Sequence, residues 1–228
     1  MMDVYLPLAF AVILGLTYYF SNKYSIRHKE WNKKIISFSA GVSITYILLE
    51  LFPVFTEGAL ILNKLLFVSI LVGFIAHHII EKEIYKHNHR HELIKMLSLE
   101  ENIFSFVYHI IIGAVMVTFF KSSVIQGVLF FIPMVFYTFL STLPTSPHPK
   151  KIKGALLSGA TFIGAVIGVV LWTVIPSWFQ FMLMGLAIGA LLFTVIRHHI
   201  PFGRRGRIGW FTIGFSAYSL LIILSWYI

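Results

Sequence analysis

Residues 35–55 read IISFSAGVSITYILLELFPVF, and this stretch decides the fold. As a helix rising about 1.5 Å per residue, it is long enough to cross about 30 Å of hydrocarbon. Lys33 and Lys34 precede it, and its one charged side chain is Glu50. An apolar run of this length with basic residues at one end predicts a transmembrane helix.

Seven more apolar stretches of similar length lie along the chain, at residues 4–20, 59–80, 103–120, 124–143, 154–175, 178–196 and 208–228. The composition agrees, because 58% of the 228 residues are hydrophobic and 12% are charged, whereas soluble domains carry about 25% charged residues. The connecting segments are short except for residues 81–102, which we interpret as a His-containing cytoplasmic loop. The sequence therefore predicts an all-α polytopic membrane protein with eight transmembrane helices in a single domain, residues 1–228.

The basic residues predict the orientation of these helices. Of the 18 Lys and Arg residues, only Lys64 and Lys121 fall outside one alternate set of loops. Because Lys and Arg are enriched in cytoplasmic loops, both termini are expected on the outside of a multi-pass protein of the cell membrane. The net charge of +9 then reflects topology and attraction to the lipid bilayer, and nucleic acid is not an expected partner.

Two of the stretches share a spacing that indicates an internal repeat. Gly41 and Pro53 are separated by the same interval as Gly189 and Pro201. The first stretch is predicted to run outward and the second inward. This is typical of inverted-topology repeats, and it predicts a 3+2+3 bundle in which helices one to three are related to helices six to eight.

Two ionisable residues are expected within the hydrocarbon. Glu50 lies deep in the second stretch and His109 lies near the inner end of the fourth. Intramembrane ionisable groups are costly, so each is a candidate functional residue. A neutral imidazole is a common metal ligand, but His109 could equally be a core residue bonded to a backbone carbonyl. Glu50 could be a protonated packing residue.

Histidines gather on the predicted inner face. His87, His89 and His91 alternate in the 81–102 loop, where an extended chain could bring all three to one metal ion. A solvated loop of mixed charge is the alternative interpretation. His198 and His199 end the seventh stretch on the same face. The chain has no Cys, so His and carboxylates are its candidate metal ligands.

Three segments carry a family resemblance. They are SAGV with LELFP at residues 39–42 and 49–53, KKIKGALLSG at residues 150–159, and MGLAIG with IP at residues 184–189 and 200–201. In order and spacing the chain resembles the ZIP (Zrt/Irt-like) metal transporters. The resemblance implies a permease for a divalent metal ion of the zinc type, and it leaves a homodimer open. Glu50 would lie at the outer approach, His109 on the path, and the inner-face histidines would collect or sense the metal.

The metal motifs of that family are only partly present. The fourth stretch keeps His109 from the family's His-Asn-x-Pro-acid-Gly, and no acid follows Glu101 anywhere in the chain. A non-transporting subunit or metal sensor is therefore one alternative. A membrane enzyme with a His-bound metal at the cytoplasmic face is another, but the expected His-x-x-His-His spacing is absent, so we do not expect an enzyme. We expect no cofactor beyond Zn²⁺ as substrate or loop ligand.

Overall fold

The computed structural model describes residues 2–23, 29–87, 90–141, 151–199 and 207–228, and every element in these ranges is helical. Helices η1 and η3 are π-helical and η2 is a 3₁₀ helix. In chain order the elements are α1 (Met2–Lys23), α2 (Lys29–Tyr46), η1 (Ile47–Leu51), α3 (Phe52–Leu62), η2 (Lys64–Leu66), α4 (Phe67–His87), α5 (Arg90–Ser122), α6 (Val124–Ser141), α7 (Lys151–Leu171), α8 (Ser177–Thr194), η3 (Val195–His199) and α9 (Ile208–Ser225).

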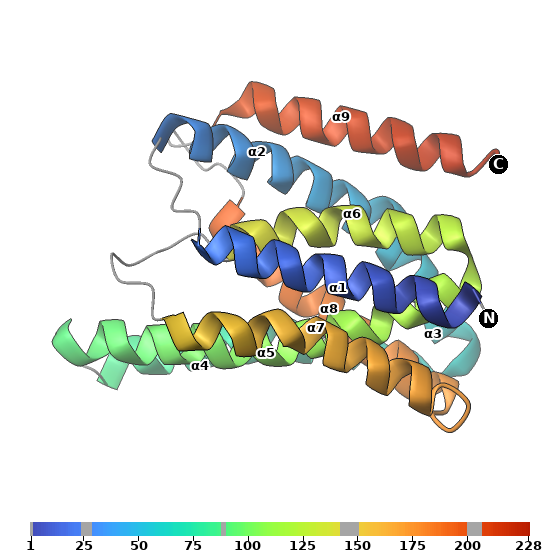
Figure 1. Ribbon diagram of the computed structural model, residues 1–228, viewed down its shortest axis with the longest axis horizontal. Coiled ribbons are helices and arrows are strands. Elements are labelled where there is room, and N and C mark those ends of the chain that lie inside the picture. Colours follow the sequence, from blue (N-terminus) through green and yellow to red (C-terminus); the bar gives the residue numbers. More distant parts are fainter. Residues whose placement is uncertain (1, 24–28, 88–89, 142–150, 200–206) are drawn as a thin grey trace.

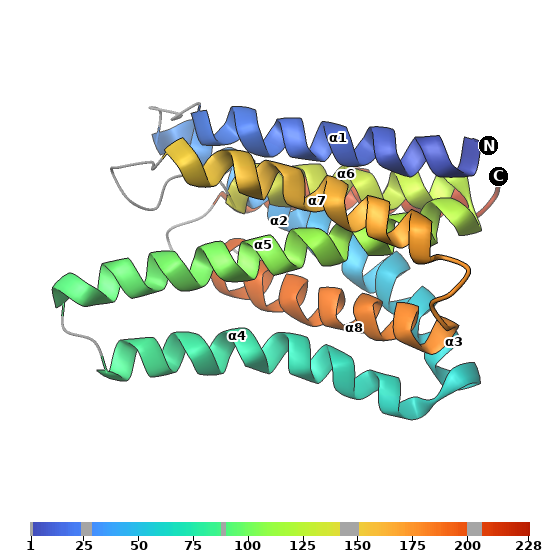
Figure 2. The same ribbon diagram turned by 60° about the horizontal axis from the view of Figure 1, so that its bottom comes forward.

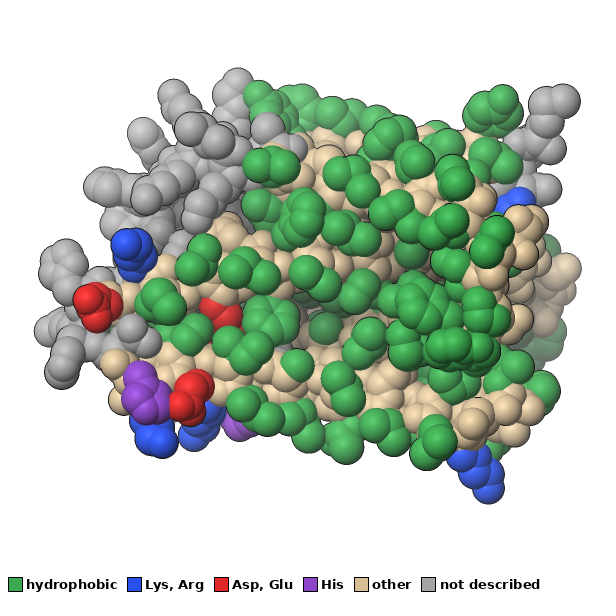
Figure 3. Space-filling view, turned by 90° about the horizontal axis from the view of Figure 1, so that it is seen from below, with side chains coloured by type: hydrophobic (Ala, Val, Ile, Leu, Met, Phe, Trp, Pro, Cys, Tyr) green, Lys and Arg blue, Asp and Glu red, His purple; other side chains and the backbone are tan. Residues whose placement is uncertain are grey.

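Six helical segments are long and apolar enough to cross a membrane. They are Val4–Ser21, Lys33–Leu62, Lys64–His87, Lys95–Ser122, Ser177–Arg197 and Ile208–Ser225. On the face that Figure 3 displays, hydrophobic side chains cover the middle of the molecule, and charged side chains gather toward its ends. The prediction of an all-helical protein with several membrane-spanning helices is therefore confirmed. The apolar parts of α6 and α7, Val124–Phe139 and Leu156–Leu171, are shorter than 18 residues.

The helices form one elongated bundle (Figure 1). Successive helical runs alternate in direction, and the N- and C-terminal ends of the described chain lie at the same end of the bundle (Figures 1 and 2). Helix α7 packs along α1 and α5, and α6 packs along α1, α2 and α5. The pairs α2 and α9, α4 and α8, and α5 and α7 each consist of neighbouring helices that run in the same direction.

Two element boundaries differ from the sequence prediction. The second helical run continues through η1 and α3 to Leu62, so Ala59 belongs to it and not to the third stretch. The chain turns at Asn63, whose side-chain Oδ1 accepts a hydrogen bond from Leu65 N at 2.9 Å. Hydropathy does not reveal this boundary, because it reports how apolar the side chains are. The turn depends instead on the hydrogen bond between the Asn63 side chain and the backbone.

Most of the segment predicted as a loop at residues 81–102 is also helical. Helix α4 extends to His87, and α5 begins at Arg90 and runs for 33 residues to Ser122. The residues on both sides are largely Glu, Lys, Leu and Ile, which continue a helix beyond the hydrocarbon as readily as within it. In Figure 2 the two helices project past the rest of the bundle at this end.

Facing glycines bring three pairs of helices into backbone contact. In each pair the glycine of one helix lies against the backbone of the other, and the glycine pairs are Gly41 with Gly214, Gly73 with Gly189, and Gly113 with Gly164. A Cβ on Gly41 would overlap the carbonyl oxygen of Phe211 and lie 2.7 Å from the backbone nitrogen of Phe215. Lipid gives helices no hydrophobic reason to associate, so close van der Waals packing at small residues holds such pairs together.

The second and seventh helical runs share a further feature. The π-helical segments Ile47–Leu51 and Val195–His199 are 148 residues apart, the same separation as Gly41 and Gly189. Gly41 lies against the backbone of Phe211 and Phe215 in α9, and Gly189 lies against the backbone of Ile70 and Phe74 in α4 in the same pattern. A π-helical turn adds a residue to a helix and often marks a functional position.

The glycine contacts give a test with a matched control. Gly41→Ala should lower the free energy of unfolding by about 1–3 kcal/mol, because the new methyl group must push α9 away from α2. Gly159→Ala should leave stability unchanged or raise it by up to about 1 kcal/mol, because a Cβ there meets no atom within 4 Å and Ala favours helix over Gly. Thermal unfolding of the two variants in detergent measures the difference. Equal melting temperatures would contradict the proposed backbone contact.

Candidate functional site

Helix α2 and η1 carry a buried polar stripe on one side. Ser39, Ser43, Tyr46 and Glu50 follow one another at intervals of four, three and four residues, which places them on one helical face. The two serines and Tyr46 are fully buried, and Glu50 is 6% exposed. A stripe of polar side chains facing the interior of an otherwise apolar bundle is unusual. Each side chain must find a hydrogen-bond partner, or its burial costs free energy.

Glu50 is surrounded by aromatic side chains. The Trp226 indole, just past the end of α9, donates a hydrogen bond to the Glu50 carboxylate. The hydroxyls of Tyr46 and Tyr218 lie close enough to interact with the carboxylate electrostatically. Tyr218 is itself held in place, because its hydroxyl donates a hydrogen bond to the carbonyl oxygen of Leu129 in α6 at 2.5 Å. Glu50 is thus buried among the helices.

His109 is fixed on α5 in one tautomer. Its Nδ1 lies 2.6 Å from the backbone carbonyl oxygen of Ser105, and because a carbonyl only accepts, Nδ1 carries the proton. Nε2 therefore has a free lone pair. It is buried, and the described residues offer it no hydrogen-bond partner. The ring of Tyr18 contacts the imidazole edge-on at 5.3 Å between centroids.

Tyr108 is buried next to His109 on α5. Its ring packs on Tyr137 of α6 at 4.9 Å between centroids and lies beside the His109 ring. Its hydroxyl interacts electrostatically with that of Tyr46 across the gap between α5 and α2. We call the set Ser39, Ser43, Tyr46, Glu50, Tyr108 and His109 the polar column. Its two ionisable members, Glu50 and His109, contact different side chains.

The structure accounts for the other predicted metal residues only in part. His87 Nδ1 pairs with Glu83 Oε1 at 2.9 Å on the exposed side of α4. His89 lies outside the described residues, as do the side chains of His91, His198 and His199. Within the described part of the chain, no three His, Asp or Glu side chains are grouped to hold a metal ion.

An ion pair ties the seventh helical run to the third. Arg197 in η3 donates to Glu81 Oε1 of α4 at 2.5 Å, and its guanidinium also lies over the Phe193 ring at 5.8 Å from the centroid. The Glu81 side chain is 10% exposed and that of Arg197 is 40% exposed. This pair joins α4 and η3 at the end of the bundle where α4 and α5 project.

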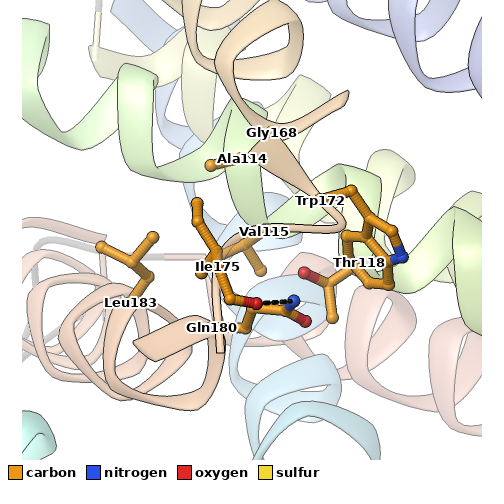
Figure 4. A pocket seen from close by; sticks show the side chains of 8 residues that line it. All are labelled: Ala114, Val115, Thr118, Gly168, Trp172, Ile175, Gln180 and Leu183. Carbon is orange, nitrogen blue, oxygen red and sulfur yellow. Dashed lines mark hydrogen bonds between the residues drawn. The ribbon is translucent and has the colours of Figure 1, made fainter. Parts of the chain in front are cut away.

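A small cavity lies away from the polar column, between α5, α7 and α8 (Figure 4). Its volume of about 20 Å³ has room for about one water molecule. Gln180 reaches across its floor and donates a hydrogen bond from Nε2 to the carbonyl oxygen of Ile175 at 3.3 Å. None of the residues lining this cavity belongs to the polar column.

Sequence reasoning found the two ionisable members of the polar column and missed the hydroxyls. Ser39, Ser43 and Tyr46 could have been recognised from their spacing with Glu50, since the four residues share one helical face. Tyr108 precedes His109 directly, and nothing in its local sequence distinguishes it from a Tyr facing lipid. Its burial is set by how α5 packs against α6.

The fold and the site define a class of protein: an all-helical polytopic membrane protein with ionisable and hydroxyl side chains buried among its helices. Comparison of the chain with protein-family models and with curated proteins gives no match.

The Arg197–Glu81 pair gives a prediction for stability. Arg197→Ala should lower the free energy of unfolding by about 1–3 kcal/mol, between the values for exposed and buried pairs, because it leaves a largely buried carboxylate unpaired. Glu83→Ala, two residues away on the exposed side of α4, should change it by less than about 1 kcal/mol. Thermal unfolding in detergent distinguishes the two. A smaller effect for Arg197→Ala than for Glu83→Ala would contradict the structural role of the pair.

Proposed function

We propose that this protein is a ZIP-like permease of the cell membrane that moves a divalent metal ion of the zinc type along the polar column. The observation that carries the proposal is the pair of buried ionisable groups, the Glu50 carboxylate and the free Nε2 of His109, with the buried hydroxyls of Tyr46 and Tyr108 beside them. Intramembrane groups of this kind commonly mark an ion pathway. Glu50 would receive the ion from one end of the column and His109 would bind it next.

The proposal includes eight membrane crossings. Helices α6 and α7 would cross with the six longer segments, and their packing along α1 and α5 supports this. A hydrophobic run slightly shorter than the hydrocarbon is accommodated by local thinning of the bilayer at a modest cost. With eight crossings, both termini lie on one side, outside the cell by the distribution of Lys and Arg. In Figure 1 the N- and C-terminal ends lie at the same end of the bundle, which agrees with an even number of crossings.

We further propose that helices one to three and six to eight form an inverted repeat. Three features support it. The interval from Gly41 to Pro53 equals that from Gly189 to Pro201, the two π-helical segments match, and the glycine contacts of α2 with α9 match those of α8 with α4. In such repeats the transported ion binds near the middle of the membrane, where helices are interrupted. Glu50 lies within one of the two π-helical segments.

A non-transporting subunit or metal sensor is the second candidate. The observation that favours it is the lack of a three-ligand cluster among the described residues. A bare divalent ion normally takes about four ligands in a structural site and at least three from the protein in a catalytic one. In this second candidate His87, His89 and His91 would bind the metal outside the hydrocarbon, and the polar column would remain closed.

Zinc flux into vesicles tests the proposal. Purified protein in liposomes that contain a zinc-sensitive dye should admit Zn²⁺ faster than protein-free liposomes. Glu50→Gln and His109→Ala should each reduce the initial rate by at least about tenfold, because each removes a group that binds the ion, worth 1.4 kcal/mol or more.

Matched controls replace residues of the same two types at exposed positions. Glu57→Gln alters an exposed acid seven residues beyond Glu50, and His78→Ala alters an exposed histidine of α4. Both variants should retain the wild-type rate. Absence of flux in the wild-type protein would reject the permease in favour of the non-transporting candidate. Equal flux in all five proteins would remove the roles of Glu50 and His109.

A further inference from the structure

Two buried tyrosines are held without the hydrogen bonds that such residues normally make. The hydroxyls of Tyr46 and Tyr108 are inaccessible to solvent, and no described residue lies within hydrogen-bonding geometry of either. Tyr218, in the same region, contrasts with them because it donates to the Leu129 carbonyl. Burying a hydroxyl without a partner costs free energy, and a buried Tyr hydroxyl usually finds a partner. Phe would fill the same space without that cost.

Each of the two tyrosines lies beside one ionisable member of the polar column. Tyr46 precedes Glu50 by one turn of α2 and interacts electrostatically with its carboxylate. Tyr108 precedes His109 on α5, and its hydroxyl interacts with that of Tyr46. A path from Glu50 to His109 along the phenolic oxygens of Tyr46 and Tyr108 would therefore be lined by polar atoms.

The charge available along this route is small. Glu50 supplies one negative charge, and the remaining members of the polar column are neutral hydroxyls and an imidazole. A divalent cation would keep a net positive charge after leaving Glu50, and oxygen dipoles must stabilise it at that point. Phenolic oxygens with both lone pairs free can do so, either directly or through water that the ion keeps.

We propose that the hydroxyls of Tyr46 and Tyr108 form an intermediate binding step for a partly hydrated divalent cation between Glu50 and His109. This inference rests on the proposed transport function and assigns the residues that bind the ion in the middle of its path. The free oxygens of the two phenols are then part of the binding site and not packing defects. Ser43, on the same face of α2, lies at the inner end of this step.

The proposal predicts opposite signs for transport and stability. Tyr46→Phe and Tyr108→Phe each remove one oxygen and keep the ring. Zinc flux into liposomes should fall by about five- to tenfold, as expected for the loss of one ligand contact. The melting temperature should stay unchanged or rise, because the substitution removes a buried hydroxyl that has no partner. If these hydroxyls had a structural role, their removal would instead lower the melting temperature.

Two further variants calibrate the measurements. Tyr85→Phe changes an exposed tyrosine of α4 and should leave both flux and melting temperature at the wild-type values. Tyr218→Phe removes a hydroxyl that donates to Leu129 and should lower the melting temperature, which verifies that the assay detects the loss of one buried hydrogen bond. Each flux is divided by the amount of folded protein recovered in the vesicles.

The outcomes separate the two proposals. Wild-type flux together with reduced flux and undiminished stability in Tyr46→Phe and Tyr108→Phe supports the intermediate step. Wild-type flux with unchanged flux in both variants overturns this inference and leaves the permease intact. A lowered melting temperature in both variants also overturns it, because the hydroxyls would then be structural. Absence of flux in the wild-type protein overturns the permease and this inference together.

Discussion

The close approach of helix backbones at glycines is the constraint on which the rest of this structure depends. A bundle in lipid gains nothing from burying apolar surface between its helices, so it is held by contact at short range. Gly41, Gly73 and Gly113 each lie against the backbone of a partner helix that runs in the same direction. These contacts fix which helices are neighbours, and so fix which faces of α2, α5 and α6 turn inward.

The polar column follows from that arrangement. With Gly41 against α9, the face of α2 that carries Ser43, Tyr46 and Glu50 is directed into the bundle. Tyr108 and His109 are buried on α5, which is itself fixed by the contact of Gly113 with α7. The interior thus contains several polar atoms whose partners are incomplete, and the packing energy of the glycine contacts must offset their burial. Such an arrangement is more expected of a site with a function than of a core selected for stability alone.

The sequence was sufficient for the class of protein and insufficient for the details of the site. Apolar runs of membrane-crossing length predict helices directly, because lipid requires every backbone hydrogen bond to be made within the segment. Glu50 and His109 could be identified because ionisable residues are rare within such runs. The turn at Asn63 and the start of α5 at Arg90 could not be identified in this way. Both depend on polar residues, and hydropathy does not distinguish a polar residue in a turn from one in a helix. Tyr46 and Tyr108 differ from lipid-facing tyrosines only through the packing of helices distant in sequence.

Accessibility of single cysteines tests the central claim, that successive helical runs, α6 and α7 included, cross the membrane in alternate directions. The chain contains no Cys, so a cysteine at position 86, 123, 151 or 177 can be labelled without background. A membrane-impermeant maleimide added to intact cells should label Ser123→Cys and Ser177→Cys, and should label Lys86→Cys and Lys151→Cys only after the membrane is opened. Labelling of Lys151→Cys from the same side as Ser123→Cys would contradict the crossing of α6 and α7, and with it the proposed eight-crossing architecture.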